Sequence, residues 1–517
     1  MTPVPDVSVL QKNIAANLAG GVWTGLMGLV FVPVYIHFIG IEAYGLMGIF
    51  ATLLAIFFLL DMGLSGTLNR EMARLAVQEG SAREMRDLLR TLEIPYWLAG
   101  LLISAIVIAA SPFIAYRWVN AEHLSPGTVQ TAIRIMGLAA AFQWPIGLYS
   151  GGLMGLQRQV PLNVIAIVMA TVRGLGAVLI LWLVSPTVEA FFYWQLAVSV
   201  VHVGVAAFFL WRSLPHAPEP PCFRRALLVN VWRFAAGMTG ITVTVTILMQ
   251  LDKVILSRML SLEMFGYYAL ANVVTLVLYR LGGPVFTATY PRLTSLVALG
   301  ATEDIKRLYH QSTQLVAVLI LPAALVLAMF SEEVLLLWTR SPVTAERAHV
   351  LVSILVAGTA VNGVLQIPYA LQLAHGWTRI AILGNIVSVV LLVPLMIVLT
   401  TWYGAAGAAS IWVALNVGYL LISVPVMHLR LLPGEQWRWY AQDVGRPLLA
   451  GLGVAVVGRL FIKADWPPML MVTSLAVVGA GTLAAAACAA SQLRVIARGR
   501  SIVTALVLRH SHSGNPR

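Results

Sequence analysis

The sequence predicts an all-α polytopic membrane protein, and three observations support this fold class. Of the 517 residues, 59% are hydrophobic and only 10% are charged, whereas a soluble domain has about 25% charged residues. The mean hydropathy is correspondingly high, at +0.86. Apolar runs such as 98–110 and 315–329 lack the alternating polarity, in segments of about ten residues, that is typical of a membrane β-barrel. The composition therefore excludes an ordinary soluble enzyme and favours helices that lie in lipid.

A bilayer core about 30 Å thick requires about 20 apolar residues per spanning helix. Fourteen runs of about this length are separated by charges and turns, and each is predicted to be a helix. They cover 14–38, 43–66, 94–117, 129–155, 162–184, 190–211, 234–257, 264–290, 311–338, 347–375, 380–400, 405–428, 447–463 and 468–491. The first run is too long for a cleavable signal peptide, so we expect it to act as its own insertion signal. Prolines within these spans are predicted kinks: Pro33, Pro145, Pro284, Pro322, Pro368 and Pro394.

The distribution of cations predicts the orientation, because positively charged loops are retained in the cytoplasm. With the N-terminus inside, 23 of the 33 Lys and Arg residues fall in inner segments, five in outer segments and five within helices. Both termini are thus predicted to be cytoplasmic. The net charge of +12 is explained by this topology, so we expect no nucleic-acid partner.

The prolines of segment 212–233 predict a stiff cytoplasmic linker between two lobes. The N-lobe is 1–211, with helices 1–6, and the C-lobe is 234–428, with helices 7–12. Two additional helices, 13 and 14, occupy 429–491, and a basic cytoplasmic tail occupies 492–517.

The two lobes are predicted to be parallel repeats. Ile-Glu-Ala-Tyr-Gly-Leu at 41–46 matches Leu-Glu-Met-Phe-Gly-Tyr at 262–267, 221 residues further on, and each follows the first helix of its lobe. Six helices separate the copies, and an even number gives both lobes the same orientation in the membrane. Such repeats place a binding site between the halves. The alternative is a shared helix-turn without common ancestry.

Several motifs together resemble a known family. They are Asn13 before the first helix, FIGIEAYG at 38–45, LDMGL at 60–64, QLDKVIL at 250–256 and GYYA at 266–269. Over roughly 10–430 the chain resembles the polysaccharide-transporter branch (Wzx-type flippases) of the multidrug/oligosaccharidyl-lipid/polysaccharide (MOP) exporter superfamily, which includes the MATE drug exporters. The resemblance implies an inner-membrane flippase that moves a polyprenyl-diphosphate-linked oligosaccharide from the cytoplasmic to the periplasmic leaflet. The product would enter O-antigen, capsule or exopolysaccharide assembly, with a polysaccharide polymerase and other glycan-assembly proteins as expected partners.

Two kinds of alternative function stay open. One is a lipid II or teichuronic-type flippase, or a drug exporter, of the same superfamily; helix 1 lacks the acidic residue that drug exporters usually carry there. The other is a membrane glycan polymerase or ligase. However, the longest outer loop, around 118–127, has no room for a catalytic domain. We therefore expect a transporter rather than an enzyme.

A charge inside the membrane costs at least about 2.5 kcal/mol, so an intramembrane ionisable residue indicates function. Four cations are candidate substrate-binding residues around a hydrated central cavity, where they would offset the diphosphate during alternating access: Arg173, Arg280, Arg134 and Lys253. Arg173 lies too deep to reach an interface easily, and a structural pairing with a neighbouring helix is its alternative. Arg134 and Lys253 lie near the outer surface and can instead snorkel. Arg459, in helix 13, is expected to be structural.

Asp61 and Asp252 are candidate gating or coupling residues. Either could bind a coupling proton or cation, or neutralise an arginine of the opposite lobe. Asp252 and Lys253 need not pair, because adjacent helical residues point about 100° apart. The sequence has no Walker loop, no HExxH motif and no nucleophile elbow, so we expect no catalytic residue, cofactor or metal site. The membrane potential, at about 2.3 kcal/mol per charge per 100 mV, could bias the direction of transport.

Overall fold

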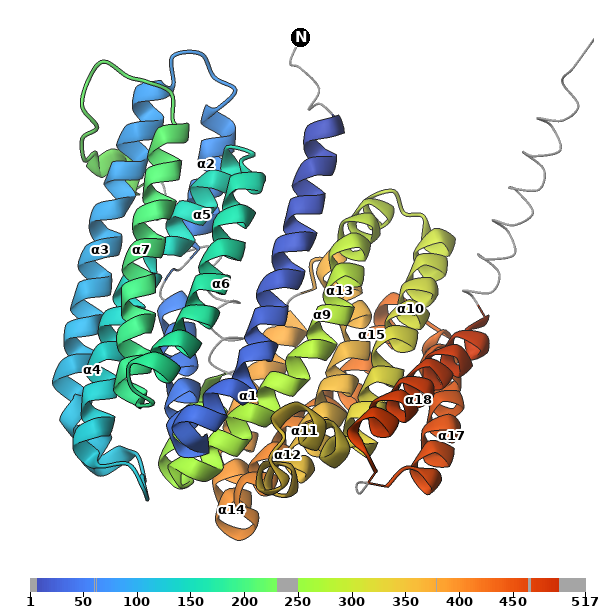
Figure 1. Ribbon diagram of the computed structural model, residues 1–517. Helices are drawn as coiled ribbons and strands as arrows, with labels where there is room; N and C mark the ends of the chain where they lie inside the picture. Colours follow the sequence, from blue (N-terminus) through green and yellow to red (C-terminus); the bar gives the residue numbers. More distant parts are fainter. Residues whose placement is uncertain are drawn as a thin grey trace, which may run out of the picture. The chain divides into compact units, whose positions relative to one another are not determined.

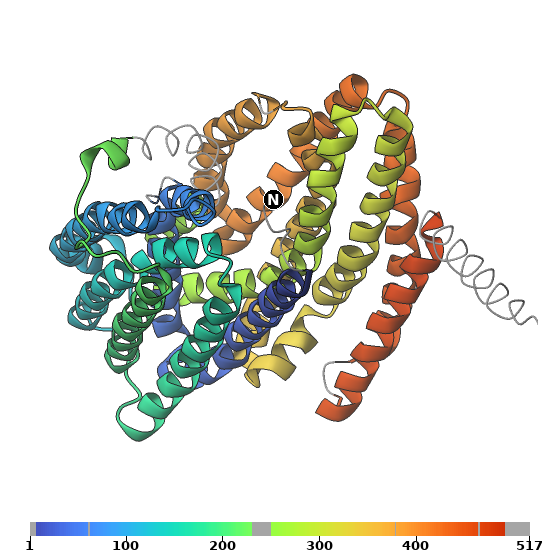
Figure 2. The same cartoon turned by 90° about the horizontal axis from the view of Figure 1, so that it is seen from above.

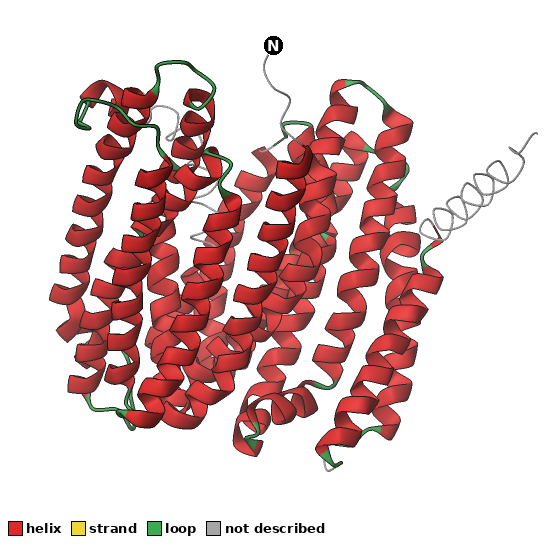
Figure 3. Cartoon of the chain, turned by 45° about the horizontal axis from the view of Figure 1, so that its top comes forward, coloured by secondary structure: helices red, strands yellow, loops and turns green. Residues whose placement is uncertain are grey.

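The computed structural model describes residues 7–59, 61, 63–229, 250–377, 379–463 and 466–491. These residues are almost entirely helical and contain no β-strand (Figure 3), which confirms the all-α prediction. The chain forms two compact units, Met1–Gly266 and Tyr267–Arg517. The predicted lobes, divided by the segment 212–233, stay a prediction.

The first unit contains the following helices and π-helical turn: α1 (Val7–Leu59), α2 (Leu64–Leu75), α3 (Ala82–Phe113), η1 (Ile114–Trp118), α4 (Pro126–Gln143), α5 (Pro145–Gly155), α6 (Gln159–Leu183) and α7 (Val188–Ser213). Helix α9 (Leu262–Ala298) begins at the end of this unit. The pairs α1 and α6, α3 and α4, and α4 and α7 pack side by side (Figure 1).

Two helix breaks in the first unit have identifiable reasons. Within α1, Gly40 has φ 79° and ψ 165°, a conformation that glycine adopts without the steric cost of a side chain. This break falls between the first and second predicted spans. The predicted span 129–155 is divided at Trp144 into α4 and α5, because Pro145 has no N–H to continue the ladder and serves as the first residue of α5.

Aromatic side chains fill the core of the first unit. The rings of Tyr96 and Trp144 stack with centroids 4.5 Å apart, and Phe57 meets Trp144 edge-on at 6.0 Å. Tyr35 of α1 meets Phe191 of α7 edge-on at 5.0 Å. Such aromatic pairs contribute about 0.5–1.5 kcal/mol each beyond their burial. They join α1, α3, α4 and α7 into one core.

The second unit contains the rest of α9 and these elements: α10 (Thr302–Met329), α11 (Ser331–Thr339), α12 (Pro342–Val364), α13 (Gln366–Ala374), α14 (Arg379–Gly418), η2 (Tyr419–Ser423), α15 (Val424–Leu431), α16 (Gln436–Arg438), η3 (Trp439–Gly445), α17 (Arg446–Phe461) and α18 (Pro468–Ala489). Gly404, with φ 59°, divides α14 between two predicted spans. The predicted kink at Pro368 is also close to a break, since α12 ends at Val364 and α13 begins at Gln366.

Helices α17 and α18 correspond to the two predicted additional helices, and both pack against α10 (Figure 2). Arg459 of α17 forms an ion pair with Glu333 of α11, whose side chain is only 1% exposed. The predicted structural role of Arg459 agrees with this ion pair. Elsewhere on α10, His310 contacts Asp443 of η3, and Gln314 Nε2 donates to Asp443 Oδ1 at 2.8 Å.

Exposed apolar side chains recur every three or four residues along one face of α6, a pattern that suits contact with lipid: Val160, Val164, Val168, Val172, Leu175 and Leu179. Ten helical segments of the described residues are long and apolar enough to cross a membrane, and the chain is therefore a multi-pass membrane protein. Two of them, Ala15–Phe58 and Leu383–Leu431, each overlap two predicted spans. The predicted span 234–257 lies mostly outside the described residues, and the number fourteen stays a prediction.

Candidate functional site

Arg173 lies on α6 in the middle of its span and is held by α7. Its guanidinium donates to Gln195 Oε1 at 2.8 Å and to Ser199 Oγ at 3.4 and 3.5 Å. Gln195 and Ser199 are 4% and 0% exposed. All these acceptors are neutral, and Arg173 forms no ion pair among the described residues. The contacts orient the guanidinium but leave its positive charge unneutralised.

The other two arginines occupy different positions. Arg134 of α4 is exposed and donates from Nε to Ser111 Oγ of α3 at 3.2 Å. Arg134 lies eight residues from the start of α4, which is about 12 Å along the helix axis. The long arginine side chain can extend from there toward the membrane surface, as in snorkelling. Arg280 is exposed on α9, four residues before Pro284, and belongs to the second unit.

Lys253 and Asp252 pair with each other. Lys253 Nζ lies 3.2 Å from Asp252 Oδ1, and the two side chains are 25% and 27% exposed. The sequence left this pairing open, since adjacent residues on a helix diverge, but the long side chain of Lys253 reaches the carboxylate of Asp252. An adjacent carboxylate reduces the charge that Lys253 presents to an anionic ligand.

Asp61 lies two residues before the N-cap residue of α2, Gly63, and accepts hydrogen bonds from the first turn of the helix. Its carboxylate accepts from the backbone N–H of Ser65 at 3.2 Å and from the Ser65 hydroxyl at 2.8 Å. The first-turn amides of a helix have no partner within the helix, so a carboxylate there is stabilising. This local contact is a use of Asp61 that the sequence analysis did not anticipate. Its predicted gating or coupling role stays a prediction, as does the common cavity of the cations.

Two buried acids of α3 were also not anticipated. Glu93 accepts from Tyr149 Oη at 3.0 Å and from Trp211 Nε1 at 2.8 Å, which links α3 to α5 and α7. Asp87 is 0% exposed and accepts from the Cys222 backbone N–H at 2.8 Å. The donors in these three hydrogen bonds are 56 to 135 residues away from the acids, so no local motif could reveal these contacts.

The two copies of the repeated motif touch each other reciprocally. A β-carbon added at Gly45 would overlap the carbonyl oxygen of Leu262, and one added at Gly266 would overlap that of Ile41. Because 41 corresponds to 262 and 45 to 266 at the repeat offset of 221 residues, each glycine meets the symmetry-equivalent carbonyl of the other copy. This exchange agrees with the predicted repeat, and it requires the two backbones to approach without side chains between them.

The helices are arranged as in multi-pass membrane proteins of known structure. The structure matches that of the lipid II flippase MurJ in an inward closed conformation with a TM-score of 0.67 and 14% identity, over 91% of this chain and 97% of MurJ. It matches an inward-facing multidrug resistance MATE transporter of the MOP superfamily with a TM-score of 0.62 and 15% identity, over 81% and 94% of the two chains. These likenesses confirm the predicted MOP-like fold.

Sequence comparison gives the family. The chain belongs to the family described as polysaccharide biosynthesis proteins, whose pattern it matches over residues 10–297. It is 20% identical over 402 residues to a putative O-antigen transporter of Shigella flexneri. The aligned residues cover 78% of this chain and 93% of that relative. The family resemblance predicted from the sequence motifs is thereby confirmed.

Proposed function

We propose that the protein is a flippase that moves a polyprenyl-diphosphate-linked oligosaccharide from the cytoplasmic to the periplasmic leaflet of the inner membrane. The family match and the O-antigen transporter relative support a polysaccharide or O-antigen precursor as cargo. The fold shared with a lipid II flippase supports transport rather than catalysis as the activity. Both termini are cytoplasmic in this proposal, and a polysaccharide polymerase consumes the product.

Arg173 carries the chemical part of this proposal. Arg173 lies in the middle of a predicted span, and its guanidinium is hydrogen bonded to Gln195 and Ser199, without a counter-ion among the described residues. Neutral dipoles fix the planar group while its charge remains available to a phosphate, which arginine can bind through two oxygens. In the proposed mechanism Arg173 and Arg280 attract the diphosphate, and alternating access carries it across.

Flipping can be measured with the purified full chain in vesicles that contain a labelled polyprenyl-diphosphate oligosaccharide. We expect the wild type to transfer label to the opposite leaflet without extending the glycan. A charge-assisted hydrogen bond contributes about 1.5–3 kcal/mol, so Arg173→Gln should slow flipping about 10- to 100-fold. Arg173→Lys should retain more activity, because it keeps the charge.

The matched control is Arg307→Gln, which removes an exposed arginine paired with Asp304 outside the proposed route. It should flip at the wild-type rate. Thermal unfolding and membrane insertion of each variant separate transport from folding. Normal flipping by a doubly reversed Arg173→Glu, Arg280→Glu variant would reject the binding role, and chain extension by the purified protein alone would favour a polymerase.

A further inference from the structure

The loop between η1 and α4 is fastened to the start of α9 within the first unit. The backbone N–H of Leu262 donates to the carbonyl oxygen of Asn120 at 2.8 Å, and Asn120 Nδ2 donates to the carbonyl oxygen of Arg258 at 2.9 Å. Trp118 Nε1 donates to Ser257 Oγ at 3.0 Å. Two segments about 140 residues apart in the sequence are therefore held in a fixed register.

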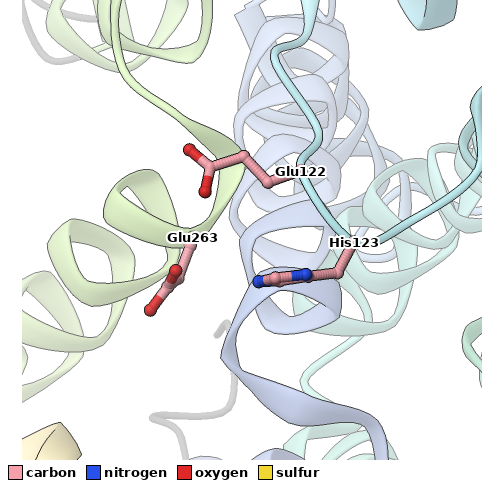
Figure 4. Close-up of side chains that lie close together, drawn as sticks. All are labelled: Glu122, His123 and Glu263. Atoms are coloured by element: carbon pink, nitrogen blue, oxygen red, sulfur yellow. The ribbon is translucent and has the colours of Figure 1, made fainter.

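The two repeat-equivalent glutamates converge on one dipeptide of this loop, Glu122–His123. Glu42, which is 6% exposed, accepts the backbone N–H of Glu122, and its two oxygens lie 3.1 and 3.0 Å from the His123 backbone nitrogen. Glu263, the equivalent residue in the second copy, lies beside the side chains of the same dipeptide (Figure 4). Glu42 thus binds the backbone of the loop, and Glu263 lies next to the side chains of Glu122 and His123.

Three potential metal ligands meet there. One ligand atom each of Glu122, His123 and Glu263 lies within 4.8 Å of the other two. In Figure 4 the imidazole ring of His123 points toward Glu263, and the Glu122 carboxylate extends toward the same segment. Ligand atoms of one ion are about 3–4 Å apart, given metal–ligand bonds of about 2.0–2.2 Å. The ligand atoms therefore need to move about 1–2 Å closer together. Rotation of the exposed Glu122 and His123 side chains can bring them this close.

We propose that Glu122, His123 and Glu263 bind a divalent first-row transition-metal ion of the Zn²⁺ type. One imidazole nitrogen with two carboxylates suits such an ion, whereas Mg²⁺ and Ca²⁺ prefer oxygen ligands alone. Water would complete the coordination. The bound ion would crosslink the loop before α4 to the first turn of α9, next to the contact between Gly45 and Gly266. The proposal goes beyond the proposed transport activity and does not depend on it.

Zinc binding can be measured by titration calorimetry on the tag-free full chain. The chain also carries His510 and His512 in its tail, so all proteins should carry His510→Ala and His512→Ala to remove that competing pair. We expect one equivalent of ZnCl₂ to bind and to raise the thermal unfolding temperature, while MgCl₂ at the same concentration does neither. His123→Ala and Glu263→Gln should each weaken zinc binding at least about tenfold, since each removes a ligand.

The control is His349→Ala, because His349 is a half-buried histidine whose Nδ1 lies 2.8 Å from the Glu346 carbonyl oxygen of its own helix. It should bind zinc with the same affinity as the protein that carries only His510→Ala and His512→Ala. Glu122→Gln, on an exposed side chain, provides a further ligand deletion if another variant does not fold. Zinc affinity unchanged by deletion of His123, equal loss in His349→Ala, or equal binding of Mg²⁺ would each overturn the proposal.

Discussion

Substitution of Gly45 by alanine tests the reciprocal contact between the two copies of the repeat. The added β-carbon would overlap the Leu262 carbonyl oxygen, well inside the 3.0 Å that real β-carbons keep from other heavy atoms. The obstacle is backbone, so it cannot rotate away as a side chain would. Overpacking of this kind costs about 1–3 kcal/mol, and Gly266→Ala should cost a similar amount because its β-carbon meets the Ile41 carbonyl in the same way.

Gly28→Ala is the matched control, since Gly28 lies on the same helix and has nothing within 4 Å of an added β-carbon. Alanine stabilises an open helical position by up to about 1 kcal/mol relative to glycine. The two variants should therefore differ by about 1–4 kcal/mol. At about 2 °C per kcal/mol for a unit of this size, the difference in unfolding temperature is about 2–8 °C.

Thermal unfolding in one detergent, followed by tryptophan fluorescence, measures this difference. The double variant Gly45→Ala, Gly266→Ala should lose less than the sum of the single losses, because the first substitution already separates the two segments. Equal unfolding temperatures for Gly45→Ala and Gly28→Ala would refute the contact, and strict additivity would refute its reciprocity.

Three further predictions concern individual side chains. Arg459→Met should lower the free energy of unfolding by about 1–3 kcal/mol, because it leaves Glu333 buried without its partner. This range is discounted for the partial exposure of the arginine. Adding Glu333→Gln should recover most of the loss in unfolding temperature. Asp61→Ala should cost about 0.5–2 kcal/mol through loss of a helix cap, whereas Asp61→Asn should keep both the fold and vesicle flipping, and lost flipping would instead favour a coupling role. Burial raises the pKa of Glu435, but the charge of His310 and other neighbours outweighs it, so the folded pKa is below the usual value. The ionised Glu435 therefore stabilises the fold above the unfolded pKa of about 4.3, and this stabilisation is lost as the pH falls through the folded pKa. Glu435→Gln should make the unfolding temperature depend less on pH in that acid range. An unchanged dependence on pH would contradict this role of Glu435.

The sequence determined the fold class and the family. Apolar runs of about 20 residues predict membrane helices because every backbone polar group in lipid must be bonded within the helix. The repeated motif around Glu42 and Glu263 was visible because both copies keep a glutamate and, three residues later, a glycine at a fixed offset. Arg173 was singled out by its depth alone, since a charge in a long apolar run is costly.

The tertiary structure decided which side chains meet. Gln195 and Ser199 as partners of Arg173, and Glu333 as the partner of Arg459, lie on other helices, and hydrophobic periodicity says nothing about which helices become neighbours. Likewise, Glu122–His123 and Glu263 are a candidate metal site only because backbone hydrogen bonds bring two distant segments together. Local sequence patterns indicate whether a segment is helical and whether it lies in lipid, whereas contacts between helices depend on packing of the whole chain.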